Sequence, residues 1–71
     1  MNWTPSALDR LERAMDEGAR IQMRRRGTEI TMVPSRLRHD YGGEILIGHH
    51  LGTGDRVEVP LDEVDDFVVL D

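Results

Sequence analysis

Six arginines in the first half of the sequence have types and spacing that suit anion binding: Arg20, Arg24, Arg25, Arg26, Arg36 and Arg38. A guanidinium group carries planar, bidentate donors that match phosphate and carboxylate oxygens. Alternation along two expected strands places one pair of these arginines on the outer face of each strand. The residues predicted to contact an anionic ligand or nucleic acid are Arg24, Arg26, Arg36 and Arg38.

A group of carboxylates near the end of the sequence offers a competing use for these arginines. Its members are Asp62, Glu63, Asp65 and Asp66. On one small domain they could pair with the arginines and cancel the basic surface. In the other interpretation they form an acidic surface that docks on a basic partner protein. The sequence leaves both alternatives open.

Side chains that support catalysis or metal binding are scarce. The sequence has no cysteine, which excludes disulfides and thiolate chemistry. His49 and His50 are adjacent and face opposite sides of a strand, and with His39 they match no metal-binding spacing. The two serines, Ser6 and Ser35, have no histidine expected near them. We therefore predict a protein that is not an enzyme and that has no metal or cofactor.

Length and composition indicate one small domain over residues 1–71. A chain of 71 residues buries a thin core, and 38% hydrophobic with 32% charged residues is typical of a soluble globular protein. The net charge of −5 is uneven, because residues 1–38 carry +3 and residues 39–71 carry −8. The longest apolar runs are three or four residues, and no secretory signal is visible, so we expect a cytoplasmic location without membrane contact.

The first element that positions these groups is a helix expected at about 5–17. Thr4 or Ser6 can cap its start, Pro5 suits its first turn, and Gly18 is expected to end it. Large apolar residues follow at helical spacing and give the helix one apolar face: Leu8, Leu11 and Met15.

From residue 20 the hydrophobic pattern has a period of two, which predicts five or six short strands. They are expected at 20–26, 28–33, 36–41, 44–50, 56–59 and 67–70. Hairpin signals at 26–28, 42–43 and 52–55 require antiparallel neighbours. Pro34 is expected to end the second strand, because proline cannot donate to a strand ladder. Many short strands in a short chain favour a small closed barrel over about 20–70.

Two positions depart from simple alternation. Arg25 has the parity of the core residues, so either a bulge or the strand end releases its side chain to water, or its guanidinium lies over the mouth of the barrel. The last strand is apolar on both faces from Phe67 to Leu70. Either the helix covers its second face, or another subunit extends the sheet and the chain forms a homo-oligomer.

The order of these signals resembles the WYL domain, a Sm-like small barrel of bacterial transcriptional regulators. The resemblance covers about residues 7–70 and rests on Pro34, Gly42-Gly43 and the stretch Leu61-Asp62-Glu63-Val64, where the family typically has Leu-Asp-Arg-Ile. The name-giving triplet aligns with Glu44-Ile45-Leu46 and keeps only its leucine. The resemblance implies an α+β fold with an N-terminal helix on a strongly bent, antiparallel, five-stranded Sm-like barrel. It also implies a regulatory binding module.

A weaker resemblance points to the Rho-binding antiterminator proteins, which are small acidic Sm-like barrels with one N-terminal helix. It rests on size, acidic excess and element order rather than on a motif. This similarity implies a protein-interaction module that docks through acidic residues onto a basic partner, and it is the alternative function.

Overall fold

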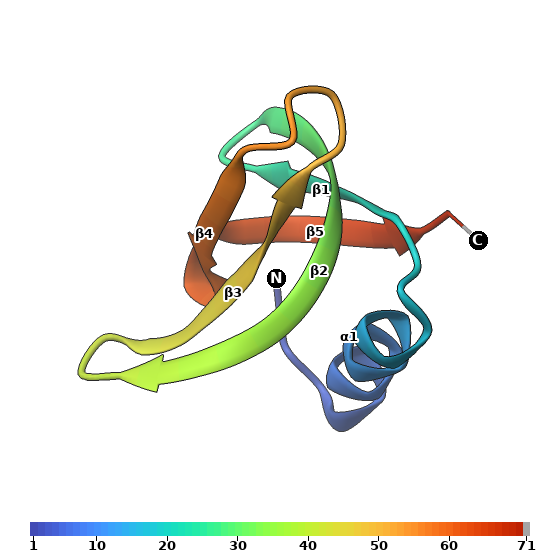
Figure 1. The fold of residues 1–71 in the computed structure, drawn as a ribbon. Coiled ribbons are helices and arrows are strands. Elements are labelled where there is room, and N and C mark those ends of the chain that lie inside the picture. The colour runs from blue at the N-terminus through green and yellow to red at the C-terminus, as the bar shows by residue number, and fades with distance from the viewer. Residues whose placement is uncertain (71) are drawn as a thin grey trace.

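Residues 1–70 contain one α-helix and five strands, and the strands form one antiparallel sheet (Figure 1). A computed structural model describes residues 1–70; Asp71, which was counted with the acidic half, lies outside them. The elements are α1 (Pro5–Glu17), β1 (Ile21–Arg25), β2 (Thr28–Asp40), β3 (Gly43–His50), β4 (Arg56–Pro60), the 3₁₀ turn η1 (Leu61–Glu63) and β5 (Val64–Val69). The predicted α+β class is confirmed.

Helix α1 begins and ends where its capping residues predict. The Thr4 hydroxyl accepts a hydrogen bond from the Ala7 amide at 3.1 Å, so Thr4 rather than Ser6 is the N-cap. At the other end, Gly18 adopts φ 64° and donates its amide to the last carbonyls of the helix. The local signals are sufficient here because both caps are made within a few residues of the helix.

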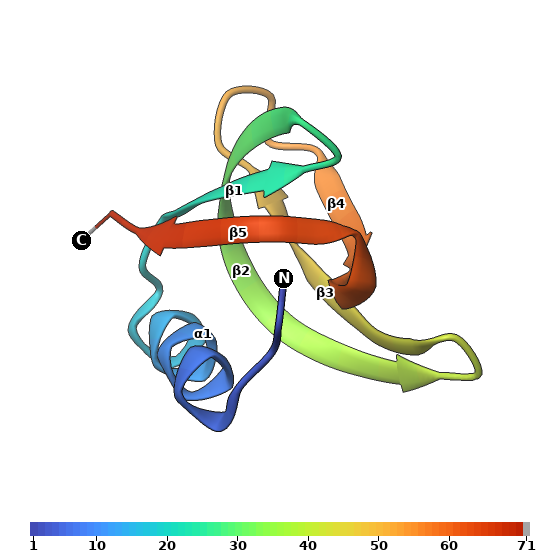
Figure 2. The same cartoon turned by 180° about the vertical axis from the view of Figure 1, so that it is seen from behind.

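The expectation that Pro34 ends a strand is wrong. Strand β2 runs without interruption for 13 residues through Pro34, and its long arc is visible in Figures 1 and 2. A bulge between Pro34 and Arg36 leaves Ser35 without a cross-strand partner, and the Ser35 hydroxyl donates to the Ile47 carbonyl at 2.9 Å. A bulge tolerates proline because the regular ladder is already interrupted there. The two strands predicted at 28–33 and 36–41 are therefore one.

The sheet is strongly bent, but its strands do not close into a barrel. Within residues 1–70 the strand order is β4-β3-β2-β1-β5, so β4 and β5 are the two edges and do not pair with each other. Strand β5 crosses the arc of β2 and β3 at a steep angle in both views (Figures 1 and 2). Between these two edges, η1 buries Leu61, and the chain continues from it into β5, which pairs with β1 and begins at the buried Val64. The expected closed barrel is not confirmed.

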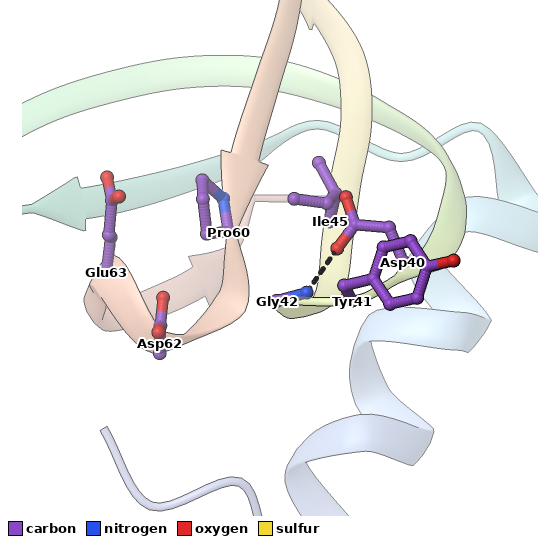
Figure 3. A pocket seen from close by; sticks show the side chains of 7 residues that line it. All are labelled: Asp40, Tyr41, Gly42, Ile45, Pro60, Asp62 and Glu63. Carbon is purple, nitrogen blue, oxygen red and sulfur yellow. Dashed lines mark hydrogen bonds between the residues drawn. The ribbon is translucent and has the colours of Figure 1, made fainter.

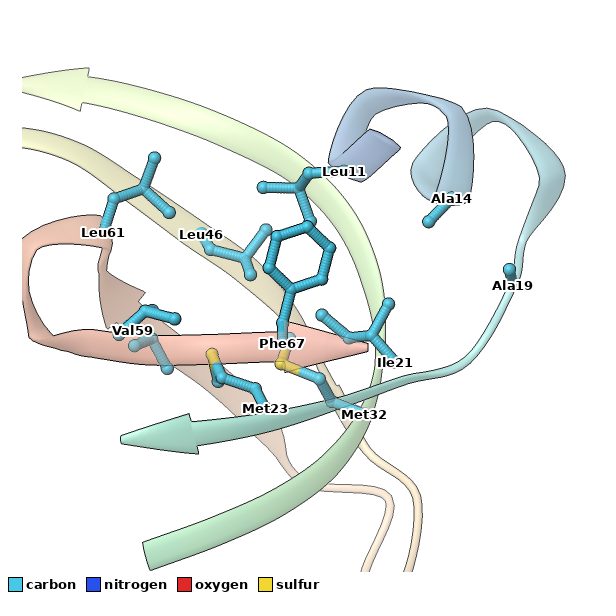
Figure 4. Packing of buried hydrophobic residues seen from close by; sticks show 11 residues of the cluster. Leu11, Ala14, Ala19, Ile21, Met23, Met32, Leu46, Val59, Leu61 and Phe67 are labelled. Carbon is cyan, nitrogen blue, oxygen red and sulfur yellow. The ribbon is translucent and has the colours of Figure 1, made fainter. Parts of the chain in front are cut away.

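The core fills the concave side of the sheet (Figure 4). Leu11 of α1 is completely buried there with Ile21, Met23 and Met32, among others. Trp3 stacks on Phe67 with 5.5 Å between ring centroids, and its indole nitrogen donates to the Leu61 carbonyl at 2.9 Å.

The helix thus contacts the Phe67 side of β5 and leaves the opposite side uncovered. On that side the exposed fraction is 57% for Val68 and 45% for Leu70. The apolar last strand was explained either by cover from the helix or by contact with another subunit. The first explanation is therefore wrong for the outward-facing residues. Oligomerisation through this strand stays a prediction. Among residues 1–70, no helix has the length and apolar character needed to cross a membrane.

Candidate functional site

The two predicted contact residues of the first hairpin are engaged with carboxylates of the same chain. The Arg24 guanidinium forms an ion pair with Asp66 of the neighbouring strand β5, and a hydrogen bond and charge attraction to Asp66 raise the pKa of Arg24. Arg26 lies in the β1–β2 turn, three-quarters exposed and 3.6 Å from Glu63. These contacts match the alternative in which the charged halves neutralise each other.

Arg25 takes the conformation expected of a bulge. The β1–β5 register shifts between Arg24 and Arg25, which releases the Arg25 side chain from the core face. Its Nε atom then donates to the Glu63 carboxylate at 2.7 Å, and the Glu63 side chain is 20% exposed. One mostly buried carboxylate therefore holds two arginines of the hairpin.

The other two predicted residues, Arg36 and Arg38, lie on β2 beyond the segment that pairs with β1. Arg38 donates to Glu58 of β4 at 2.9 Å, and Arg56 of the same strand approaches the second oxygen of Glu58 at 3.4 Å. Arg36 is exposed and forms no ion pair with another of residues 1–70. The structure therefore separates the four predicted arginines into two pairs instead of uniting them.

We refer to Arg36, Arg38, Arg56 and Glu58 as the arginine face. The strand register places it on the convex side of the sheet, because Arg36 pairs with Ile47 of β3 and Ile47 pairs with Glu58. Ile47, which lies between Arg36 and Glu58 in this row, is 4% exposed although it is not part of the main core cluster.

The charge on the arginine face is positive despite the acidic composition of the chain. Arg38 and Arg56 share the Glu58 carboxylate and Arg36 has no ion pair there, so the three arginines and one carboxylate have a formal charge of +2. His49 is the cross-strand partner of Arg56 and lies on the same side of the sheet. At the hairpin end the face is bounded by Asp40, whose carboxylate accepts the Gly42 amide at 2.8 Å. A basic surface of three strands thus stands next to an acidic hairpin end.

Arg56 is the functional candidate that sequence reasoning missed. It is the single arginine of the acidic half, and it is 20 residues from Arg36 in the sequence. Only the pairing of β3 with both β2 and β4 brings the two side chains onto one face. The alternation of residues predicts that Arg56 and Glu58 lie on the same face of their strand, but it does not predict the order of the strands.

The four predicted acidic residues are used unequally. Asp66 and Glu63 pair with arginines of the β1–β2 hairpin, and the Asp65 carboxylate accepts the Gly27 amide at 3.0 Å. Asp62 differs, because it is exposed and makes no hydrogen bond or ion pair with another residue in the described range 1–70. The predicted acidic surface is therefore reduced to Asp62 as an available carboxylate.

Two shallow hollows flank η1 and the tip of the β2–β3 hairpin. One has a volume of about 450 Å³ and lies between Asp62 and the hairpin-tip residues Asp40 and Tyr41 (Figure 3). The other has a volume of about 440 Å³ and is lined by Trp3 and Leu8, among others. The same two residues, Gly42 and Asp62, line both hollows. We refer to the two together as the hairpin cleft.

The histidines are separated and have local roles. His39 lies 3.1 Å from Glu44 across the β2–β3 hairpin. The Nδ1 atom of His50 accepts the amides of Gly52 and Thr53 and so organises the β3–β4 turn. Within the described residues, no three potential metal-ligating side chains come together.

Comparison of the chain with protein-family models, curated proteins and solved structures found no match. The resemblance to WYL domains and to Rho-binding antiterminators therefore stays a prediction. The functional argument below rests on the residues and on the geometry of the two surfaces.

Proposed function

We propose that this protein is a non-enzymatic binding module whose arginine face contacts the phosphates of single-stranded nucleic acid. A cytoplasmic role in the regulation of transcription or RNA metabolism, as in the WYL-like proteins that the sequence resembles, is part of the proposal. The observation that carries it is the shared position of Arg36, Arg38 and Arg56 on one side of three strands, with one carboxylate among them.

The spacing of these arginines suits an extended anion better than a single small one. Residues two apart on a strand are separated by about 6.6 Å, and strands two apart by about 9.6 Å. Arg36 and Arg38 are two residues apart on β2, and Arg56 lies on β4, which is two strands away from β2. A sugar–phosphate backbone that crosses the sheet can therefore meet several guanidinium groups in turn.

The same geometry predicts weak binding without strong sequence preference. Glu58 competes with phosphate for Arg38 and Arg56, and the net charge of −5 repels a polyanion at long range. No aromatic residue belongs to the arginine face, so it lacks a base-stacking platform. Contacts to phosphate position a nucleic acid but do not read its sequence.

Fluorescence anisotropy at low ionic strength tests the proposal with labelled oligothymidylate and oligouridylate. We expect Arg36→Ala to weaken both interactions about fivefold, as for loss of one exposed charge contact. Arg13→Ala is the matched control, because it removes the same charge from an exposed position on α1. We expect that variant to bind like the unmodified protein.

Three results would contradict the proposal. The unmodified protein could fail to bind either oligonucleotide, or the two variants could lose affinity equally, which would indicate only an effect of net charge. A competition experiment distinguishes recognition of a nucleic-acid polymer from recognition of a single phosphate-bearing molecule. If ATP displaces the oligonucleotide at equal concentration of molecules, the surface recognises a single phosphate-bearing ligand and the nucleic-acid proposal is wrong.

A further inference from the structure

The hairpin cleft combines an apolar floor with four carboxylates and contains no arginine, and the ammonium group of Met1, which lines one hollow, donates to the Val64 carbonyl at 3.0 Å. In its N-terminal half, Trp3 and Leu8 are partly buried and Leu61 is 6% exposed. In its other half, Ile45 and Pro60 supply the apolar surface. The carboxylates that line the two hollows are Asp40, Glu44, Asp62 and Glu63. This surface is therefore opposite in charge to the arginine face.

Three of these carboxylates already have partners within the described chain. Asp40 accepts the Gly42 amide, Glu44 lies 3.1 Å from His39, and Glu63 holds Arg25. Asp62 has no such partner among residues 1–70, and it lies where the two hollows meet. An exposed carboxylate between two partly apolar hollows is suited to a cationic group that carries apolar neighbours.

Tyr41 adds a second feature that favours a guanidinium group. It lines the cleft from the tip of the β2–β3 hairpin, and its side chain is fully exposed, without packing against the rest of the chain. A phenol ring offers a face for a cation–π contact, and arginine makes this contact more often than lysine does. Figure 3 shows Tyr41 and Asp62 on opposite sides of Gly42.

We propose that the hairpin cleft binds an arginine-bearing segment of a partner protein. The arginine pairs with Asp62 and contacts Tyr41, and flanking apolar side chains of the segment cover Trp3 and Leu8. Charge complementarity selects this occupant, because the cleft offers carboxylates and no guanidinium, and the chain as a whole carries −5. The cleft adjoins the arginine face, because Arg38 pairs with Ile45 and Ile45 pairs with Pro60, and both partners line the cleft. The residues proposed to contact the segment, Asp62, Tyr41, Trp3 and Leu8, do not belong to the arginine face.

Trp3 makes the test direct, because it is the single tryptophan of the chain and it lines the cleft. The probe is a capped pentapeptide with one arginine between two leucines and a glycine at each end. We expect the peptide to change the Trp3 fluorescence saturably and to shift the amide resonances of Gly42, Gly43 and Glu44. Two further peptides, with citrulline for arginine or with serine for both leucines, are expected to bind several-fold more weakly.

Asp62→Asn and Asp65→Asn form a matched pair of variants, since both remove one carboxylate charge within four residues of each other. Asp65 contacts the Gly27 amide and does not line the cleft. We expect Asp62→Asn to weaken peptide binding about fivefold and Asp65→Asn to leave it unchanged. Oligonucleotide binding serves as a separate readout and should be the same in both variants.

Several outcomes would overturn the proposal. They are absence of a saturable response, equal affinity of the two variants, and resonance shifts confined to other surfaces. A second copy of the chain is the remaining occupant to test. If the resonances of Gly42 and Gly43 shift with protein concentration in the absence of peptide, the cleft is an interface between copies and the peptide proposal is wrong.

Discussion

Gly48 of β3 lies directly opposite Pro34 of β2, and the two backbones approach unusually closely. A Cβ atom added at Gly48 would lie 3.0 Å from the Cα atom of Pro34 and would overlap the Val33 carbonyl oxygen. The close contact occurs beside the bulge that bends β2. The close approach of β2 and β3 beside this bulge therefore requires a residue without a side chain at position 48.

The first prediction is that Gly48→Ala destabilises the protein by about 1–3 kcal/mol, because backbone atoms must move to accept the methyl group. Urea unfolding followed by circular dichroism measures the effect. Gly42→Ala is the control, since the nearest atom to its added Cβ would be at 3.5 Å, an ordinary contact. An unchanged unfolding midpoint for Gly48→Ala would show that the two strands separate without cost.

The second prediction is that Arg26→Asn stabilises the protein. Arg26 adopts φ 48°, a left-handed conformation that asparagine tolerates better than arginine. Its contact with Glu63 is long and mostly exposed, so little is lost with it. We expect a gain of about 0.5–1 kcal/mol, seen as a higher thermal midpoint. Arg13→Asn, which makes the same charge change on the helix, is expected to produce no gain.

The third prediction is that the two carboxylates that pair with arginines of the β1–β2 hairpin contribute unequally to stability. Glu63→Gln is expected to lower the free energy of unfolding by about 1–2 kcal/mol, because Arg25 is left without the charge of its mostly buried partner. Asp66→Asn is expected to leave the unfolding midpoint nearly unchanged, since its pair with Arg24 is about half exposed on both sides. Equal losses in the two variants would contradict this ranking, and urea titrations of both decide it.

The fourth prediction concerns the β3–β4 turn. His50→Ala removes the ring nitrogen that accepts the Gly52 amide at 3.0 Å and the Thr53 amide at 3.3 Å. We expect faster hydrogen exchange at both amides and a loss of about 1 kcal/mol in stability. His50→Asn supplies a carbonyl acceptor at a similar reach and should restore much of the protection. If both variants exchange at the rate of the unmodified protein, the turn does not depend on this acceptor.

The fifth prediction gives the salt dependence of nucleic-acid binding. Three phosphate contacts to a single strand imply that the logarithm of the association constant falls with the logarithm of salt concentration with a slope of about −2. Arg56→Ala should make this slope shallower by about 0.7. A slope near zero would mean that the oligonucleotide is not held through its phosphates, and anisotropy titrations at several salt concentrations provide the measurement.

The sequence predicted the local elements well because their signals are local. Thr4, Pro5 and Gly18 define the ends of α1 through contacts made within a few residues. The glycine-containing turns define three hairpins for the same reason. Pro34 misled the prediction, because its effect depends on a bulge and on the space left by Gly48, which is 14 residues away in the sequence.

The candidate site was predictable only in part. Arg36 and Arg38 were expected on one outer face, but their grouping with Arg56 requires the strand order β4-β3-β2. Arg24 was assigned to the same surface, although the pairing of β1 with β5 brings it to Asp66. The alternation of apolar and polar residues predicts which face of its strand a residue occupies, but it does not predict which other strand lies beside that strand.

By itself the sequence determined the α+β class, the helix and the hairpins, and it left open the choice between neutralised and available charges. Only the tertiary structure decided that choice, and it decided it differently for each group. Arginines of the β1–β2 hairpin meet carboxylates because β5 returns to pair with β1. Arg36 and Asp62 have no such partner within residues 1–70. The reason is physical: ion pairs form over a few ångströms, and those distances are set by long-range strand pairing.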